Sequence, residues 1–521
     1  MTSKKEKKEP ENDTNFHPYM PGTEDVIKEI LKFEAIKTVK ETDTDKEPLY
    51  LYIKPIINKF TNELTNPENA GIFVRGEDEI KQISERTKLK IIKEMLQKCK
   101  ELADEDNDQL EYALNRKLIH DGITNHEVQE IMQNIRRKTF VDRATMNPDG
   151  YIPLKTGLLS LKDWTMQEFT ASKFFTWKVR GTYDPSVTSL NQTPLFFKFL
   201  NESYPDNSIQ TLLDYMAYSL YPSFPRQKVL VIVGPPRIGK GTIANLMQKI
   251  LNEGFGRISL MKLLIPDNKF SLQGIEGKRL LVDTEIKREF KKNTDFDVVN
   301  SLFGGDPLPL ERKYHQEFTY ISKSAGLLIG NLPLFRVNNT AFLSRLLIIT
   351  TREKREFKEV PNMAELIFDG EGDLIVSLLL NRLRSLILRD FEFSNELTND
   401  EYAELWELLS DSTQAFVEEG LIDSKTNSKV DDIYNFYVED YCKGKGIPPE
   451  SKHVFVSRVG KVYPKKQVKK DGKRVYAFTG CSILTEVEIQ REQEHIQEVN
   501  QKVDKFSKEN FPEYNQQDDP T

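Results

Sequence analysis

The sequence predicts an α/β fold with a mostly parallel central sheet, a mainly helical region before it, and helices followed by a β-hairpin after it. Four short apolar runs recur in the middle of the chain, at residues 228–233, 279–282, 326–329 and 346–349. Such runs are typical of strands buried on both faces of a parallel sheet, and helical spacing separates several of them. Near the C-terminus, two further runs flank the dipeptide Asp471-Gly472, which favours a hairpin turn.

Composition limits the class of protein. The chain has 521 residues, which is too long for a single hydrophobic core, so several domains are expected. It has no run of about 18 apolar residues and no apolar core near its first residues, so we expect no membrane span, no secretory signal and a cytoplasmic protein. Three scattered cysteines disfavour a disulfide framework or a zinc site. The net charge of −7 means that any nucleic-acid contact must be local.

These patterns divide the chain into five expected parts. Charged and polar residues predominate at both ends and predict disordered or frayed tails. Residues 151–164 alternate around Gly157 like a small hairpin. Beyond residue 400, helices precede a basic hairpin, which is the order of a winged helix. The parts are a tail at 1–24, a mainly helical region at 25–200, the α/β domain at 201–395, a winged-helix-like domain at 400–485 and a polar tail at 486–521.

The segment after the first apolar run carries the most specific motif. It fits the pattern GxxxxGK between a predicted strand and a predicted helix. Its residues are Gly234, Pro235, Pro236, Arg237, Ile238, Gly239, Lys240, Gly241 and Thr242. Glycines let backbone N–H groups converge on phosphates, and the lysine of this motif reaches the β- and γ-phosphate oxygens. We therefore expect this loop to bind ATP.

One position of the loop departs from the usual pattern. Gly241 occupies the place where a serine or threonine normally offers its hydroxyl to Mg²⁺, and Thr242 follows one residue later. Thr242 is thus a candidate contact to the metal or to a phosphate. The same GKGT ending occurs in adenylate-kinase-like enzymes, so the loop by itself leaves both a motor and a kinase open.

Polar side chains accompany the next three apolar runs. Asp283 and Glu285 end the second run, in the arrangement needed to hold Mg²⁺ and to polarise an attacking water. Asn331 ends the third run and is a candidate sensor of the γ-phosphate. Arg345 precedes the fourth run, and its guanidinium could cross to a neighbouring subunit as an arginine finger.

Two basic segments are candidate nucleic-acid contacts. The first follows a stretch of glycine and proline and predicts a projecting loop with Arg312, Lys313 and His315. Cations for phosphates and rings for bases are how proteins grip single strands. The second is the C-terminal hairpin, whose candidate residues are Lys465, Lys466, Lys469, Lys470, Lys473 and Arg474, preceded by Arg458 and Lys461. Such density in an acidic protein implies a directed phosphate contact.

Taken together, this order of phosphate loop, acidic strand, basic loop, asparagine strand and arginine resembles superfamily 3 helicases. It looks most like the helicase part of phage, plasmid and poxvirus primase–helicases. The segments that carry the resemblance are GPPRIGKGT from 234, LLVDTEI from 280, GGDPLPLERKY from 304, LLIGNLP from 327 and AFLSRL from 341, with YIPLKTGLLSLKDW from 151 and FFKFLNESYPD from 196 upstream.

The resemblance implies a P-loop NTPase core of AAA+-like type that assembles into a ring, commonly a hexamer. Such a ring translocates on single-stranded or forked DNA with ATP and Mg²⁺, here in the replication of a phage, virus or plasmid in the cytosol of its host cell. The implied roles are phosphate binding by Lys240, metal support by Asp283, water activation by Glu285, γ-phosphate sensing by Asn331 and action on the adjacent subunit by Arg345.

The family also implies that Lys313 and His315 line the central pore. Many of its members carry a primase domain ahead of the helicase. Fewer than about 50 residues precede the recognisable region here, short of a usual domain, so we expect no primer synthesis by this chain. Either a separate primase or polymerase is a partner, or the chain is a shortened form. Two alternatives stay open: an initiator in which ATP switches assembly on origin DNA, and a nucleotide kinase with an acceptor pocket and a lid.

Overall fold

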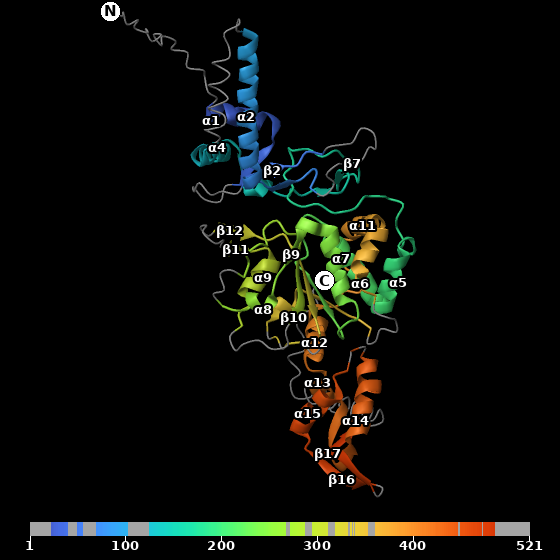
Figure 1. The fold of residues 1–521 in the computed structure, drawn as a ribbon. Helices are drawn as coiled ribbons and strands as arrows, with labels where there is room; N and C mark the ends of the chain where they lie inside the picture. The colour runs from blue at the N-terminus through green and yellow to red at the C-terminus, as the bar shows by residue number, and fades with distance from the viewer. Residues whose placement is uncertain are drawn as a thin grey trace, which may run out of the picture. The chain divides into compact units, whose positions relative to one another are not determined.

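The structure, a computed structural model, forms two compact units (Figure 1). The first unit comprises Met1–Thr182, Asn252–Gly254 and Pro309–Thr319, and the second comprises Tyr183–Leu251, Phe255–Leu308 and Tyr320–Thr521. The residues that the structure describes are 22–39, 49–55, 69–102, 124–266, 271–286, 294–310, 318–331, 334–335, 337, 339–352, 360–445, 447, 449–470 and 473–484.

The first unit combines helices with two small sheets. Its described helices are α1 (Thr23–Phe33), α2 (Glu77–Leu102) and α4 (Asn125–Lys138), with a short 3-10 turn η1 (Arg143–Thr145). One sheet has the order β3-β2-β1-β4, from β1 (Ile36–Val39), β2 (Leu49–Tyr52), β3 (Phe73–Arg75) and β4 (Phe140–Val141). The other has the order β5-β6-β7, from β5 (Tyr151–Pro153), β6 (Leu158–Ser160) and β7 (Met166–Gln167). The antiparallel pair of β5 and β6 confirms the hairpin predicted around Gly157.

A shared apolar core holds the helices of this unit to its first sheet. Ile30 of α1, Ile80 of α2 and Ile135 of α4 are at most 1% exposed, and they pack in one cluster with Leu51 of β2. Burial of each such side chain contributes about 1.5–3 kcal/mol to folding. The cluster therefore explains why helices separated by long stretches of sequence belong to one unit.

The second unit is built on a five-stranded, fully parallel sheet with the order β14-β8-β13-β10-β9. Its strands are β8 (Val229–Val233), β9 (Phe255–Arg257), β10 (Leu280–Ile286), β13 (Ala325–Gly330) and β14 (Leu346–Thr350). Four of the five coincide with the apolar runs, and β8 and β13 are buried along their whole length. The sequence did not predict β9, because only three residues form it and no apolar run marks them.

Helices pack around this sheet in the second unit. They are α5 (Pro194–Ser203), α6 (Asp206–Tyr218), α7 (Lys240–Leu251), α8 (Leu260–Leu263), α9 (Asp297–Gly304), α10 (Thr340–Leu343) and α11 (Met363–Leu388), with the turns η2 (Leu190–Gln192) and η3 (Asn252–Gly254) nearby in sequence. The helix α11 packs against α5, α6 and α7, which lie together on one side of the strands (Figure 1). Two further strands, β11 (Pro307–Leu310) and β12 (Phe318–Ile321), pair with each other, and the division between the two units falls within both of them.

Two buried carboxylates fix α5 and α6 to their surroundings. Glu371 of α11 accepts hydrogen bonds from the N–H groups of Leu195 and Phe196, at 2.7 and 2.9 Å, and so caps the first turn of α5. Asp214 of α6 is fully buried and pairs with Arg382 at 2.6 Å and with a second arginine, Arg389, at 2.7 Å. Because α5 is held by α11, residues 183–200 belong to this unit, and the boundary drawn from the sequence at residue 200 falls inside α5.

The C-terminal part of the second unit adds helices and a three-stranded sheet of order β15-β17-β16. Its elements are α12 (Asn399–Ser410), α13 (Ser412–Gly420), β15 (Leu421–Lys429), α14 (Val430–Phe436), a π-helical turn η4 (Tyr437–Cys442), α15 (Lys452–Val462), β16 (Lys465–Lys470) and β17 (Lys473–Ile483). The rings of Phe416, Tyr437 and Phe455 pack on one another in its core. The predicted hairpin is present as β16 and β17, whereas β15 was not predicted because its sequence, LIDSKTNSK, is mostly polar.

No helix among the described residues is both long enough and apolar enough to cross a membrane.

Candidate nucleotide-binding site

The parallel sheet of the second unit brings three strand ends to one edge. The last residues of β8, β13 and β14 lie side by side in the register of the sheet: Val233, Gly330 and Thr350. The next residues along the chain are Gly234, Asn331 and Thr351. Open α/β sheets bind ligands beyond the carboxyl ends of their strands, at the point where the strand order reverses. That point is β8, since the chain passes from β8 to the far edge strand β9 and later returns to both of its sides.

The loop after β8 approaches its neighbours so closely that two of its glycines leave no room for a side chain. A Cβ atom on Gly234 would lie 1.9 Å from the hydroxyl oxygen of Thr351. A Cβ atom on Gly239 would lie 2.8 Å from both the Phe199 ring and Ser203 Oγ, and its φ of +106° is one that L-residues rarely adopt. The backbone itself therefore forms the surface of this loop.

The loop closes directly on the first turn of α7. Arg237 has a left-handed φ of +63°, and α7 begins at Lys240. The first N–H groups of a helix have no partner within it, and the helix dipole adds positive potential at that end. The structure thus confirms the strand, loop and helix that the sequence predicts around an anion-binding loop.

Lys240 is turned into the site and almost completely buried, with 6% of its surface exposed. Its Nζ donates hydrogen bonds to the carbonyl oxygens of Gly234, at 2.7 Å, and Pro235, and to Asn331 Oδ1 at 3.0 Å. Desolvation by burial lowers the pKa of Lys240 to about 8. The structure therefore brings together two predicted site residues that are 91 residues apart in sequence: Lys240, the first residue of α7, and Asn331, which follows β13.

The two candidate carboxylates occupy different environments. Asp283 is 7% exposed, and its two oxygens accept the N–H groups of Leu260 at 2.7 Å and Glu285 at 3.0 Å. Glu285 is exposed, and the pairing of β10 with β13 is irregular between Asp283 and Ile286. Each oxygen of a carboxylate can accept a second bond, so Asp283 can still approach a cation. Glu285 is the carboxylate with freedom to move.

Gly241, at the loop position where a hydroxyl side chain is usual, has free space around it. A Cβ atom on Gly241 would meet nothing within 4 Å among the described residues. The next residue, Thr242, is partly buried and donates its N–H to the carbonyl of Gly239 at 3.0 Å. A larger side chain at position 241 would therefore fit, and its absence here is not imposed by packing.

Arg345 lies at the opposite edge of the sheet from the phosphate loop. The N–H of Val229, which begins β8, donates to the carbonyl of Arg345 at 2.7 Å, whereas Gly234 follows the other end of the same strand. The guanidinium donates to the carbonyl of Ala341, and its buried Nε has no hydrogen-bond partner among the described residues. Within one chain, the structure therefore does not bring Arg345 to the loop at Gly234.

The predicted DNA contacts are placed only in part. Arg312, Lys313 and His315 lie outside the described residues, between β11 and β12. Of the hairpin residues, the exposed side chains are those of Lys465, Lys466, Lys469 and Arg474, whereas the side chains of Lys470 and Lys473 lie outside the description.

One cation of the predicted basic run has a structural role instead. Arg458 of α15 pairs with Asp411 and, at 2.8 Å, with the almost buried Glu450. Its charge is used to join α15 to the start of α13, so Arg458 is not free to contact phosphate.

The edge also contains residues that the sequence analysis missed, namely Thr351, Phe199 and Ser203. Thr351 follows the fourth apolar run as Asn331 follows the third, so the same strand-end pattern identifies it. Phe199 and Ser203 carried no such signal, because α5 reaches the loop only through tertiary packing.

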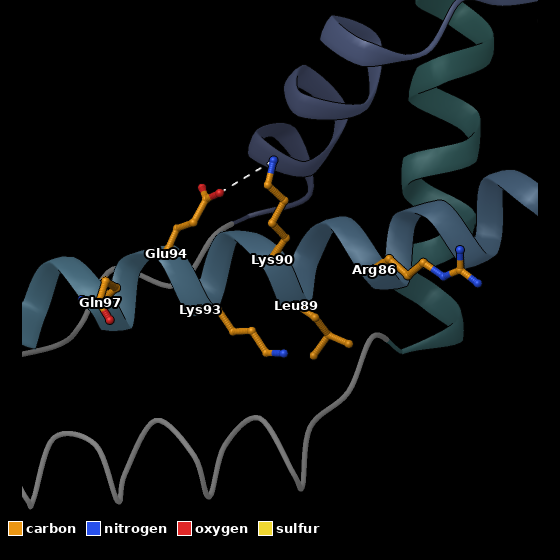
Figure 2. A pocket seen from close by; sticks show the side chains of 6 residues that line it. All are labelled: Arg86, Leu89, Lys90, Lys93, Glu94 and Gln97. Carbon is orange, nitrogen blue, oxygen red and sulfur yellow. Dashed lines mark ion pairs between the residues drawn. The ribbon is translucent and has the colours of Figure 1, made fainter. Parts of the chain in front are cut away.

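A separate hollow lies along α2 in the first unit, and none of the predicted site residues is among those that line it. Figure 2 shows its lining of Arg86, Leu89, Lys90, Lys93, Glu94 and Gln97. Lys90 pairs with Glu94 and also with Glu29 of α1. This pattern is that of a solvated, charged helix face.

Comparison with known proteins gives one family match. Residues 232–345 match the family model described as "Family of unknown function (DUF5906)". No curated protein matches the chain. The matched range extends from the end of β8 to the start of β14, and so includes Lys240, Asp283, Glu285, Asn331 and Arg345.

Several solved structures are distantly similar. One apo structure of the NrS-1 C-terminal region shares 11% identity, covers 87% of this chain and 98% of that chain, and has a TM-score of 0.36. The A form of the same region shares 13% identity over 69% and 92% of the two chains, with a TM-score of 0.32. A JCV helicase bound to a thiazolopyridine compound shares 15% identity over 50% and 67%, with a TM-score of 0.27.

Proposed function

We propose that this chain is an ATP-dependent DNA helicase of superfamily 3 type that acts as a ring, commonly a hexamer, on single-stranded and forked DNA. The observation that carries the proposal is the meeting of Lys240 and Asn331, 3.0 Å apart, at the carboxyl edge of a parallel sheet. A lysine on a glycine loop binds phosphate, and an amide at the next strand end is placed to detect whether the terminal phosphate is present.

The two carboxylates divide the remaining chemistry in this proposal. Asp283 is held by two backbone N–H groups, so it offers a fixed negative charge that supports Mg²⁺. Glu285 is exposed and free of that constraint, so it accepts the proton of the attacking water. Thr242 is the remaining candidate for a metal or phosphate contact. When bound, Mg²⁺ would neutralise the charge that develops on the phosphates.

The position of Arg345 supports the proposal that the chain assembles into a ring. Arg345 lies at the amino end of the parallel strands, whereas the loop at Gly234 lies at their carboxyl end. The two are separated by the length of the five-residue strand β8, or roughly 16 Å. An arginine that stabilises the transition state must approach the γ-phosphate directly. In this proposal it therefore acts on the nucleotide of a neighbouring subunit.

The C-terminal part supports the DNA contact. Helix α15 directly precedes the hairpin of β16 and β17, and this order is compatible with the winged-helix domain that we propose here. The exposed cations of the hairpin are suited to phosphates. A replication role with a primase or polymerase supplied by another chain follows from the same proposal.

The test is ATP hydrolysis with and without single-stranded DNA. Lys240→Ala should reduce turnover by about 100-fold or more, since it removes the charge that faces the transferred phosphate. Lys249→Ala is the matched control, because Lys249 lies on the same helix and forms only an exposed pair with Glu365. If DNA neither stimulates turnover of the wild type nor is unwound, the motor proposal is wrong.

Subunit mixing tests the ring. Lys240→Ala subunits cannot use their own loop but still carry Arg345, and Arg345→Ala subunits have the reverse defect. In mixed rings some interfaces combine an intact loop with an intact arginine, so mixing the two inactive proteins should restore part of the activity. No restoration at any mixing ratio contradicts action across the interface.

A second function is compatible with the same C-terminal part. A helix followed by a basic hairpin also suits duplex DNA, as in an initiator whose assembly on an origin is switched by ATP. Nuclease footprinting on the replicon's own DNA distinguishes the two, because an initiator protects one sequence whereas a motor alone protects none.

A further inference from the structure

The hairpin β16–β17 presents one exposed aromatic ring among its cations. Tyr476 is 58% exposed, although Phe478, two residues along the same strand, is fully buried. Alternate residues of a strand lie on the same face of a sheet. The ring of Tyr476 therefore lies on the same face of the sheet as Phe478, but it is outside the packed core of the domain.

The register of the hairpin assigns its cations to faces. Cross-strand partners share a face, and the partners are Lys465 with Phe478, Gln467 with Tyr476, and Lys469 with Arg474. We call the surface formed by Lys465, Gln467, Lys469, Arg474 and Tyr476 the Tyr476 face. Lys466 is paired with Ala477 and belongs to the opposite face.

Within the part of the hairpin that the structure describes, the Tyr476 face carries the cations Lys465, Lys469 and Arg474 and no acidic residue. The two strands contain six basic residues and no acid. Lys469 and Arg474 are directly opposite one another, an arrangement of like charges that destabilises a sheet. None of the described acidic side chains pairs with either of them. An anionic ligand would relieve this repulsion.

The ring and a cation are already combined on this face. The Nζ atom of Lys465 lies 4.9 Å from the centre of the Tyr476 ring. Single-stranded nucleic acids are bound by cations that follow the backbone and by aromatic rings on which bases stack. A duplex hides the faces of its bases within its own stack, so an exposed ring gains most from an unpaired base.

We propose that the Tyr476 face binds single-stranded DNA, with Tyr476 stacked on a base and Lys469 and Arg474 on the neighbouring phosphates. The inference rests on the proposed DNA-dependent function and names the surface and the residue that hold the strand. The sequence analysis identified the cations of this hairpin but neither Tyr476 nor the division between two faces.

The experiment measures binding of a fluorescently labelled oligothymidylate to the full chain with a non-hydrolysable ATP analogue, at several salt concentrations. Tyr476→Ala should weaken binding by about 5- to 150-fold, the effect of losing one base stack. Tyr476→Phe keeps the ring and should bind like the wild type. Because no charge is lost, the slope of log affinity against log salt should be unchanged in Tyr476→Ala.

Two single-charge variants on the same strand test the face. Lys469→Gln removes an exposed cation from the Tyr476 face, and Lys466→Gln removes an exposed cation from the other. Lys469→Gln should reduce the steepness of the salt dependence by about 0.7, the value for one phosphate contact on a single strand. Lys466→Gln, on the opposite face, should change both the slope and the affinity less than Lys469→Gln does. Thermal melting of each variant checks that the domain remains folded.

The outcomes separate this inference from the helicase proposal. Suppose that DNA stimulates ATP hydrolysis but that Tyr476→Ala binds DNA within twofold of the wild type, or that the two lysine variants behave alike. The inference about the Tyr476 face is then wrong, while the helicase proposal is still supported. If DNA binding depends on Tyr476 but DNA never stimulates ATP hydrolysis, the inference about the Tyr476 face is supported and the helicase proposal is wrong. If the wild type does not bind the oligonucleotide, or binds oligouridylate more tightly, the assignment of single-stranded DNA is overturned.

Discussion

The phosphate loop and the C-terminal hairpin both present cations, but they hold them in opposite ways. Lys240 is buried, with three oxygen acceptors around one ammonium group. Lys469 is exposed and faces another cation across the hairpin. A buried, hydrogen-bonded charge suits one ligand in one position, because each partner fixes a direction. Exposed charges suit a polymer of repeating phosphates, because counterion release requires no fixed geometry.

This contrast predicts that substitutions at the loop edge act on chemistry with large effects, whereas those at the hairpin act on binding with small ones.

The largest effect should separate the two carboxylates. Glu285→Gln should reduce ATP turnover by about 10²- to 10⁴-fold, the range for loss of a general base. Its melting temperature should stay that of the wild type, since Glu285 is exposed. Asp283→Asn should instead lower the melting temperature, because one of its two buried backbone partners loses an acceptor at a cost of about 1–3 kcal/mol. Similar melting temperatures for both variants would contradict this division.

The next effect concerns the close packing of the loop. Gly234→Ala should weaken ATP binding by about 5- to 150-fold, since the added methyl group would meet Thr351 and overpacking costs about 1–3 kcal/mol. Gly241→Ala is the matched control in the same loop, because its methyl group would meet nothing. Titration with a fluorescent ATP analogue measures both. Adding Thr351→Gly to Gly234→Ala should recover part of the affinity, and equal affinities for the two alanine variants would show that the packing does not matter.

A pH dependence should follow from the buried lysine. Burial lowers the pKa of Lys240 to about 8, and a bound triphosphate favours the protonated form. Below pH 8 the lysine is already charged, so affinity for ATP should be nearly constant. Above pH 8 binding must take up a proton, so Kd should rise by up to about tenfold per pH unit. Lys240→Arg stays protonated, and its affinity should not vary in this way. A wild-type curve that is flat to pH 9.5 would contradict the prediction.

The smallest effect should be a gain in stability at the hairpin. Lys469→Gln relieves the repulsion with Arg474 and should raise the free energy of unfolding by about 0.2–1 kcal/mol. Lys466 is opposite Ala477, so Lys466→Gln should change the free energy of unfolding little. Denaturant unfolding at low salt measures both, and the gain should shrink as salt screens the pair. A loss of stability in Lys469→Gln would show that this lysine has a structural partner.

The sequence by itself determined the local features of this protein. Runs such as residues 228–233 and 346–349 predicted buried strands because burial on both faces leaves an uninterrupted apolar pattern. The loop from Gly234 to Thr242 was predictable because its glycines, its lysine and its two flanking elements are adjacent in sequence. Asn331 was predictable as a strand-end amide, since carboxyl ends of parallel strands meet at one edge.

Only the tertiary structure decided what lies between segments distant in sequence. The sequence could not show that Thr351 presses against Gly234, that the backbone of α8 holds Asp283, or that Arg458 is used within the domain. Nor could it establish that Arg345 lies at the edge opposite the loop, because that depends on β14 running parallel to β8 beside it. In the hairpin, residue types predicted the charge, but the pairing of β16 with β17 decided which cations share a face with Tyr476. The reason is physical: composition and periodicity report burial along one element, whereas contacts depend on how elements pack together.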